Sequence, residues 1–121
     1  MDCREKNLGD ATLVTASGRI DLSNADSFRD SLSRALSTTT RALVLDFSGV
    51  DYISSAGLRS LMIVFKAGKA QGKSLAIAAL KPLVKEIFSI SRFDLVFPLF
   101  ASVRDAIKAQ APEALAALDA G

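Results

Sequence analysis

The adjacent hydroxyls of Ser54 and Ser55 are the groups in this chain best placed to carry chemistry. They follow an apolar, extended stretch and precede Ala56-Gly57-Leu58, where a helical pattern begins. Backbone N–H groups in the first turn of a helix lack partners within the helix and carry partial positive charge. A serine at this place can cap the helix or carry a phosphate. Ser54 and Ser55 are therefore candidates for a helix cap and for a modification site.

The composition removes most catalytic explanations for these hydroxyls. The 121 residues include no His, which excludes a Ser-His-Asp triad, histidine metal ligands and imidazole bases. The seven Gly are spread out, and neither a GxGxxG nor a GxxxxGK[ST] phosphate loop occurs. The groups left from which a catalytic centre could be built are carboxylates, Lys and Ser. We therefore expect no enzyme, no metal site and no cofactor.

Charge and cysteine usage limit the partners and the compartment. The 15 Lys and Arg nearly balance the 13 Asp and Glu and are scattered, so no nucleic-acid partner is expected. The single Cys3 lies in a polar N-terminal segment, where no internal disulfide can form, and a reducing cytoplasm is the default expectation. Apolar runs such as residues 61–65 are too short to span a bilayer, so no membrane insertion is expected.

The segments around the hydroxyl pair alternate between strand and helix patterns. Strands are expected over residues 11–17, 42–45, 74–80 and 95–100, with a possible further strand before Ala11. Helices are expected from Ser23, from the hydroxyl pair to about Gln71, from Pro82 and from Ser102. This alternation predicts a largely parallel sheet covered by helices.

Finer expectations concern the starts of two helices, the packing of a third and the form of the tail. Ser23 with Asp26, and Ser102 with Asp105, have the spacing of a capping pair. The helix from Pro82 should turn Leu83, Val84, Ile87 and Phe88 inward, and the tail over residues 112–121 should form a frayed turn or a short helix.

Asp21 is a second candidate site residue. It ends the segment Gly18-Arg19-Ile20-Asp21, which leads from the strand over residues 11–17 into a loop. Ligands and partners of parallel sheets usually meet the loops after strand ends, and both Asp21 and the serine pair lie on such loops. Asp21 could also serve only to satisfy nearby N–H groups of its own loop.

These residues resemble the STAS domain, and within it the bacterial anti-sigma factor antagonists, over roughly residues 8–110. The resemblance is carried by residues 18–21, 43–50, 52–58 and 82–88, followed by Phe93. It implies an α/β STAS fold with a four- to five-stranded, largely parallel or mixed sheet flanked by about four helices. With half of its residues apolar, the chain suits one domain over residues 1–121, in which residues 111–121 form a tail.

The resemblance also implies roles for single residues. The phosphorylated residue of the family lies two positions before the glycine, which is Ser55 here, with Ser54 in reserve. Many phosphorylatable members have Asp where this chain has Ser54. Asp21 matches an acidic residue near the phosphorylation site. Partner contacts are expected at Asp21, Ser54, Ser55, Ala56, Gly57 and Arg59.

The implied function is that of a cytoplasmic anti-sigma factor antagonist. Such a protein binds an anti-sigma factor with serine kinase activity, is released by phosphorylation, and is restored by a protein phosphatase. This partner switching regulates sigma-factor-dependent transcription. An alternative is a cytoplasmic STAS accessory subunit of a membrane transporter of lipids or anions. A small enzyme or nucleotide-binding protein using Ser55 and Asp21 is a third reading, but the chain lacks a base and a phosphate loop.

Overall fold

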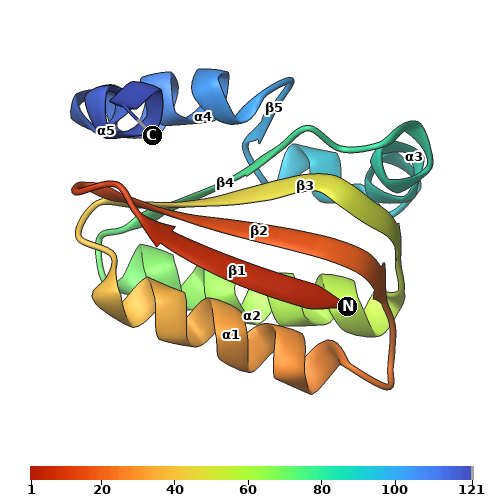
Figure 1. The fold of residues 1–121 in the computed structure, drawn as a ribbon. Coiled ribbons are helices and arrows are strands. Elements are labelled where there is room, and N and C mark those ends of the chain that lie inside the picture. Colours follow the sequence, from red (N-terminus) through yellow and green to blue (C-terminus); the bar gives the residue numbers. More distant parts are fainter. Residues whose placement is uncertain (121) are drawn as a thin grey trace.

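A mixed five-stranded sheet forms the centre of the molecule in a computed structural model that describes residues 1–120. The strands lie in the order β1-β2-β3-β4-β5 (Figure 1). β1 pairs antiparallel with β2, and the other neighbours pair in parallel. Their bounds are β1 Asp2–Asn7, β2 Ala11–Ile20, β3 Ala42–Ile53, β4 Ser74–Ala78 and β5 Leu99–Phe100. The predicted α/β class with a mixed sheet is confirmed.

The helices lie on both faces of this sheet. Two long helices cover one face side by side, two short ones lie on the other, and one lies near the end of β3 (Figure 1). The two long helices are α1 (Ala25–Thr38) and α2 (Ser55–Ala70). The two short helices on the other face are α4 (Val103–Gln110) and α5 (Leu115–Ala120), and the helix near the end of β3 is α3 (Pro82–Ile90). Residues 1–120 thus contain five α-helices, the fifth being the short helix expected in the tail. Two 3₁₀ turns, Phe93–Leu95 and Pro112–Ala114, complete the path.

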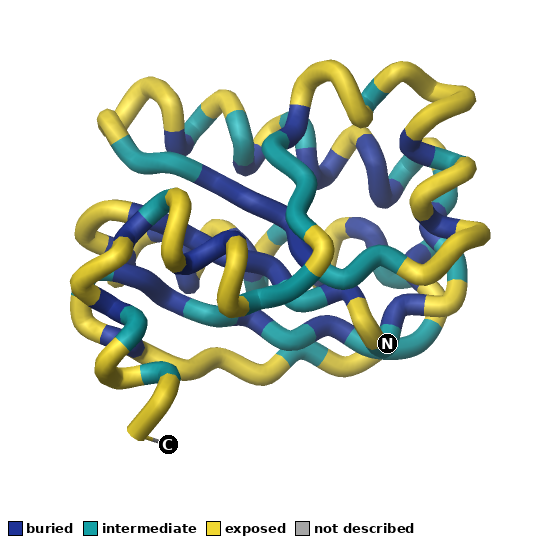
Figure 2. Tube along the Cα trace, turned by 90° about the horizontal axis from the view of Figure 1, so that it is seen from above, coloured by how far each residue is buried: buried dark blue, intermediate teal, exposed yellow. Residues whose placement is uncertain are grey.

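Apolar side chains fill both interfaces. Under α1 and α2 the core contains large residues such as Phe28, Phe47 and Leu61, all fully buried. Under α4 it contains small residues such as Ala76 and Ala106. Figure 2 shows buried residues along the central strands and exposed residues on the outer turns of the helices. The sheet is therefore covered by a thick layer on one face and a thin one on the other.

β3 is much longer than the predicted strand over residues 42–45. It continues to Ile53, with Phe47, Val50 and Ile53 buried against the helices. Its pairing with β2 shifts register between Thr15 and Ser17 and again between Gly18 and Arg19. These irregularities interrupt the period-two alternation, which is why the sequence pattern did not reveal the second half of the strand.

The predicted start of α1 at Ser23 is wrong. The helix begins at Ala25, and Asn24 occupies the position before it. The Ser23 hydroxyl is used elsewhere, because it donates to an Asp21 carboxylate oxygen at 2.5 Å. The predicted cap of α4 is confirmed, since the Ser102 side chain accepts from the Asp105 N–H at 3.0 Å.

Other differences concern strand β5, helix α3 and strand β1. The strand expected over residues 95–100 shrinks to Leu99–Phe100, because Phe93–Leu95 form a 3₁₀ turn and Pro98 has no N–H to donate. Leu83 was expected inside but is 53% exposed, whereas Val84 and Phe88 are buried. The possible further strand before Ala11 is confirmed as β1, and Cys3 on this strand packs partly buried against the core.

Candidate functional site

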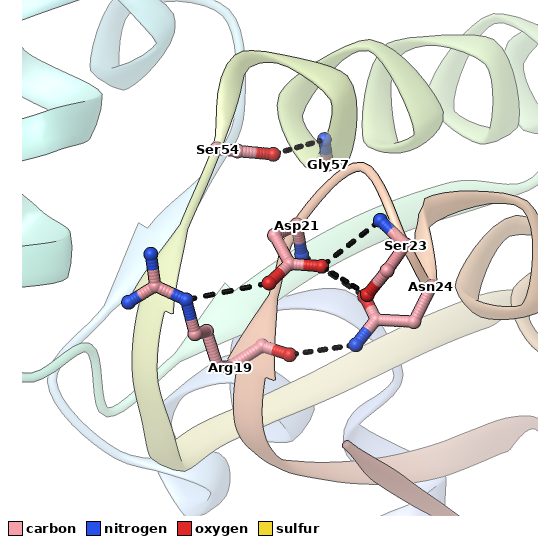
Figure 3. Close-up of polar contacts among 6 residues, drawn as sticks. All are labelled: Arg19, Asp21, Ser23, Asn24, Ser54 and Gly57. Carbon is pink, nitrogen blue, oxygen red and sulfur yellow. Dashed lines mark hydrogen bonds and ion pairs between the residues drawn. The ribbon is translucent and has the colours of Figure 1, made fainter.

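Two parallel strands bring the predicted site residues to one edge of the sheet. Ile20, the last residue of β2, pairs with Ile53, the last residue of β3. Asp21 and Ser54 follow these residues directly and therefore leave the sheet together, as Figure 3 shows. The Ser54 N–H donates to the Ile20 carbonyl at 2.9 Å, which ties the two exits to each other.

The two serines of the pair have different surroundings. Ser54 has extended backbone and is the N-cap of α2, and its Oγ accepts from the Gly57 N–H at 3.3 Å. Ser55 is the first helical residue and is exposed. Within residues 1–120 no hydrogen-bonding partner of the Ser55 hydroxyl is found. The cap thus uses Ser54, and the hydroxyl of Ser55 faces solvent.

Gly57 sets how closely α2 approaches the sheet. A Cβ on this residue would lie 2.6 Å from Ile53 Cγ1 and 2.8 Å from Ile20 Cγ2, closer than carbon atoms can pack. Gly57 is itself buried. It therefore allows the close seating of the helix on the sheet, and its predicted contact with a partner stays a prediction.

Asp21 is held by its own loop. One carboxylate oxygen accepts from the Ser23 N–H at 3.0 Å and from the Ser23 hydroxyl, and the other accepts from Arg19 Nε at 3.3 Å. The hydrogen bonds from Ser23, and then the charge of Arg19, hold the pKa of Asp21 below its ordinary value. Asp21 therefore stays ionised next to the start of α2.

The neighbours of Asp21 were not predicted from the sequence. The Asn24 amide accepts from the Asp21 N–H at 3.0 Å and donates to the Arg19 carbonyl at 2.9 Å. The Arg19 guanidinium lies 4.2 Å from the centre of the Tyr52 ring, which fits a cation–π contact. The Asp-x-Ser-Asn spacing from Asp21 to Asn24 was the available signal, since such side chains favour bonds to nearby backbone.

A groove of about 210 Å³ runs between the first turns of α1 and α2, next to Ser55. Its lining includes Leu22, Asp26, Arg29, Ala56, Arg59 and Ile63. Two of its lining side chains are large, apolar and exposed, Leu22 at 84% and Ile63 at 44%. We call this feature the α1–α2 groove. Leu22, an isolated apolar residue in a polar loop, was the one signal of it in the sequence.

The site has few groups for catalysis. Among residues 1–120 no cluster of His, Cys, Asp or Glu could hold a metal ion. A larger hollow of about 400 Å³ lies at the ends of β4 and β5, and Lys85 is the one charged residue in its lining. The arrangement around Ser55 is that of an exposed hydroxyl beside a fixed carboxylate and a groove, which suits binding and modification.

Comparison with known proteins identifies the fold. Residues 4–106 match the family model of the STAS domain. The chain belongs to the STAS domain family. In this STAS protein, no helix within residues 1–120 is long and apolar enough to cross a membrane.

Relatives of this STAS protein include anti-sigma factor antagonists. It is 38% identical over 98 residues to BtrV of Bordetella bronchiseptica, named as a candidate anti-sigma factor antagonist, covering 81% of this chain and 84% of that protein. A candidate antagonist from Thermotoga maritima has a crystal structure that is similar with a TM-score of 0.82 and 17% identity, covering 89% of this chain and 93% of that chain.

Two further structures show the same fold in different settings. The Bacillus antagonist SpoIIAA in its unphosphorylated form matches with a TM-score of 0.75 and 14% identity, over 89% of this chain and 95% of that chain. The murine anion transporter Slc26a9 matches with a TM-score of 0.72 and 21% identity, over 81% of this chain but 17% of the transporter.

Proposed function

We propose that this STAS protein is an anti-sigma factor antagonist controlled by phosphorylation of Ser55. It binds an anti-sigma factor with serine kinase activity in the cytoplasm while Ser55 is unmodified, and it dissociates when Ser55 carries phosphate. A protein phosphatase restores binding, and the exchange of partners regulates transcription by a sigma factor. The observation that carries the proposal is the exposed, unbonded hydroxyl of Ser55 beside Ser54, whose hydroxyl is used as the cap.

The chain is the substrate of the kinase and not a catalyst. The γ-phosphoryl group of ATP passes to the Ser55 oxygen, ADP leaves, and the hydroxyl proton goes to a base of the kinase or to water. The absence of His from this chain and the lack of a phosphate loop agree with a substrate role. Ser54 is the reserve acceptor, and its Oγ already accepts from the Gly57 N–H at 3.3 Å.

Phosphate at Ser55 would change the surface without requiring a new fold. It adds about −1.5 to −2 charges and three acceptor oxygens at an exposed position beside the ionised Asp21. A partner pressed against this surface would meet repulsion and would have to desolvate the phosphate. A loss of about 3 to 4 kcal/mol in binding lowers affinity several hundredfold, enough to release a partner.

The proposed contact surface is the exposed part of the site. It comprises Asp21, Ser54, Ser55, Ala56 and Arg59, all of which lie outside the core. The α1–α2 groove continues this surface, since Ala56 and Arg59 line it. A partner that covers Ser55 therefore also reaches the exposed Leu22 and Ile63.

A STAS accessory subunit of a lipid or anion transporter is the second candidate. The fold likeness to the STAS-containing anion transporter Slc26a9 supports it. Copurification with transporter subunits, and no binding to an anti-sigma factor, is the result expected for this candidate.

Incubation of the chain with the anti-sigma kinase and ATP, followed by intact-mass measurement and site mapping, tests the proposal. We expect one phosphate at Ser55. Ser55→Ala should bind the kinase normally and gain no phosphate, while Ser55→Glu should bind about tenfold or more weakly. Ser89→Glu, which adds the same charge on the exposed side of α3, is the control and should bind like the unchanged protein. Absence of phosphate from both Ser54 and Ser55, with no binding, would contradict the proposal.

A further inference from the structure

Arg59 lies one helical turn after Ser55 on the same face of α2. Ser55 is the first residue of the helix and Arg59 is the fifth, which is the i,i+4 spacing. Side chains at this spacing are neighbours, with Cβ atoms about 5–6 Å apart. Both residues are exposed, so a charged group on Ser55 would lie within reach of the Arg59 guanidinium.

The other arginines near the site already have partners. Arg19 Nε lies 3.3 Å from the Asp21 carboxylate, and its guanidinium rests on Tyr52. Arg29 lies 3.7 Å from the Asp26 carboxylate on α1. For Arg59, no acidic partner within 4.0 Å is found in residues 1–120. Arg59 is therefore the arginine beside Ser55 whose charge is available.

In the unmodified protein Arg59 belongs to the α1–α2 groove. It lines this groove together with Arg29, between the exposed apolar side chains of Leu22 and Ile63. Two arginines against the single carboxylate of Asp26 leave the groove with an excess of positive charge. This lining fits a partner segment that presents an apolar side chain next to a carboxylate, because Arg binds carboxylates through paired hydrogen bonds.

We propose that Arg59 binds the partner's carboxylate in the unmodified protein and the phosphate on Ser55 after phosphorylation. The inference rests on the proposed function for the presence of that phosphate. The phosphate and the carboxylate would compete for the N–H donors of one guanidinium, and a dianionic phosphate held by Arg59 would repel a carboxylate approaching the same group. Phosphorylation then has two effects on the partner's binding surface. It adds negative charge, and it makes the Arg59 guanidinium in the groove less available to the partner.

The internal contact can be tested without any partner. Phosphoserine is placed at position 55 by genetic encoding, and the second pKa of its phosphate is measured by ³¹P NMR titration at about 0.15 M salt, where charges more than about 8 Å apart are largely screened. Arg59→Gln should raise this pKa by about 0.3 to 0.5 units, because a cation at i+4 stabilises the dianion. Arg29→Gln and Lys66→Gln remove the same charge elsewhere in the groove and on α2, and each should shift the pKa by less than about 0.1 units. No shift in Arg59→Gln, or an equal shift in either control, would overturn the assignment.

The competition is tested by binding. We expect Arg59→Gln to weaken binding of the unmodified chain to its partner about threefold to tenfold, and phosphorylation to reduce affinity by a smaller factor in this variant than in the unchanged protein. An equal reduction in both backgrounds would refute the competition. If no anti-sigma factor binds the chain at all, the proposed function fails, while the NMR titration still decides whether Arg59 binds the phosphate.

Discussion

At the scale of residues, Ser54 and Ser55 carry the same hydroxyl group in different surroundings. The Ser54 Oγ accepts from the Gly57 N–H, whereas Ser55 is exposed at the first position of α2. A helix cap contributes to stability because it satisfies an N–H that the helix cannot. The difference separates a structural residue from one that is free to be modified.

This difference predicts opposite results for two neighbouring substitutions. Ser54→Ala should lower the free energy of unfolding by about 0.5–2 kcal/mol through loss of the cap. Ser55→Ala should leave it unchanged or raise it by a few tenths, since Ala is the better helix former. Urea denaturation measures both, and Ser102→Ala at the cap of α4 provides a comparison. Equal destabilisation by Ser54→Ala and Ser55→Ala would show that both hydroxyls support the fold.

The pKa of Asp21 supplies a second prediction at this scale. The largest cause of its lowered pKa is the hydrogen bond from the Ser23 side chain, so Ser23→Ala should move the pKa up towards the ordinary value of 3.8. A carboxylate whose pKa is lowered by folding stabilises the fold above its unfolded pKa, and this contribution is lost as pH falls through the folded pKa. Carboxyl ¹³C NMR titration measures the pKa directly, with Ser23→Thr as a control that keeps a hydroxyl. An unchanged pKa in Ser23→Ala would assign the shift to the Ser23 backbone N–H and to Arg19 instead.

At the scale of elements, the seating of α2 on β2 and β3 decides where Ser55 lies. The parallel pairing of Ile20 with Ile53 brings two strand ends together, and the missing side chain of Gly57 lets the helix approach them. The close approach is specific to this glycine. A Cβ on Gly68, farther along α2, would meet its nearest atom at 3.5 Å, an ordinary contact.

Alanine at these two glycines of α2 should therefore have opposite effects. Gly68→Ala should stabilise the protein by about 0.5–1 kcal/mol, because alanine loses less backbone entropy in a helix. Gly57→Ala should destabilise it by about 1–3 kcal/mol, because the new methyl group overlaps Ile53 and Ile20. It should also weaken partner binding, since it displaces Ser55 from the sheet edge. Thermal and urea unfolding of the two variants measure the pair, and a stabilising Gly57→Ala would refute the close-packing account.

At the scale of the whole molecule, the candidate site lies at one edge of the sheet, away from the α4–α5 layer (Figure 1). The C-terminal helices pack on the opposite face, where α4 contacts β3 and β4 through small side chains such as Ala106. A phosphate on Ser55 would therefore lie outside the apolar cores on both faces of the sheet.

Phosphorylation should therefore leave the fold intact. With phosphoserine at position 55, we expect amide NMR shifts confined to the start of α2, the loop before α1 and the groove, and a change in unfolding free energy within about 1 kcal/mol. Phosphoserine at position 89 on α3 serves as the control for added charge. Shifts that spread to α4 would mean that the phosphate acts by rearranging the molecule and not by local charge.

The sequence alone determined the class of fold and the position of the hydroxyl pair. Alternating apolar runs and helical stripes predicted the sheet covered by helices, and the local pattern around Ser102 predicted a cap that the structure confirms. These features depend on residues close together in the chain, which local spacing can reveal.

Tertiary structure decided what each site residue contacts. The choice of Asn24 and not Ser23 before α1, the network around Asp21, and the groove beside Arg59 all depend on side chains that compete for the same donors across β2, α1 and α2. The pairing of β2 with β3, including its register shifts, brings these elements together. Which side chain wins a hydrogen-bond partner depends on which atoms lie within about 3 Å of each other after folding. The spacing of residues along the chain does not predict these distances.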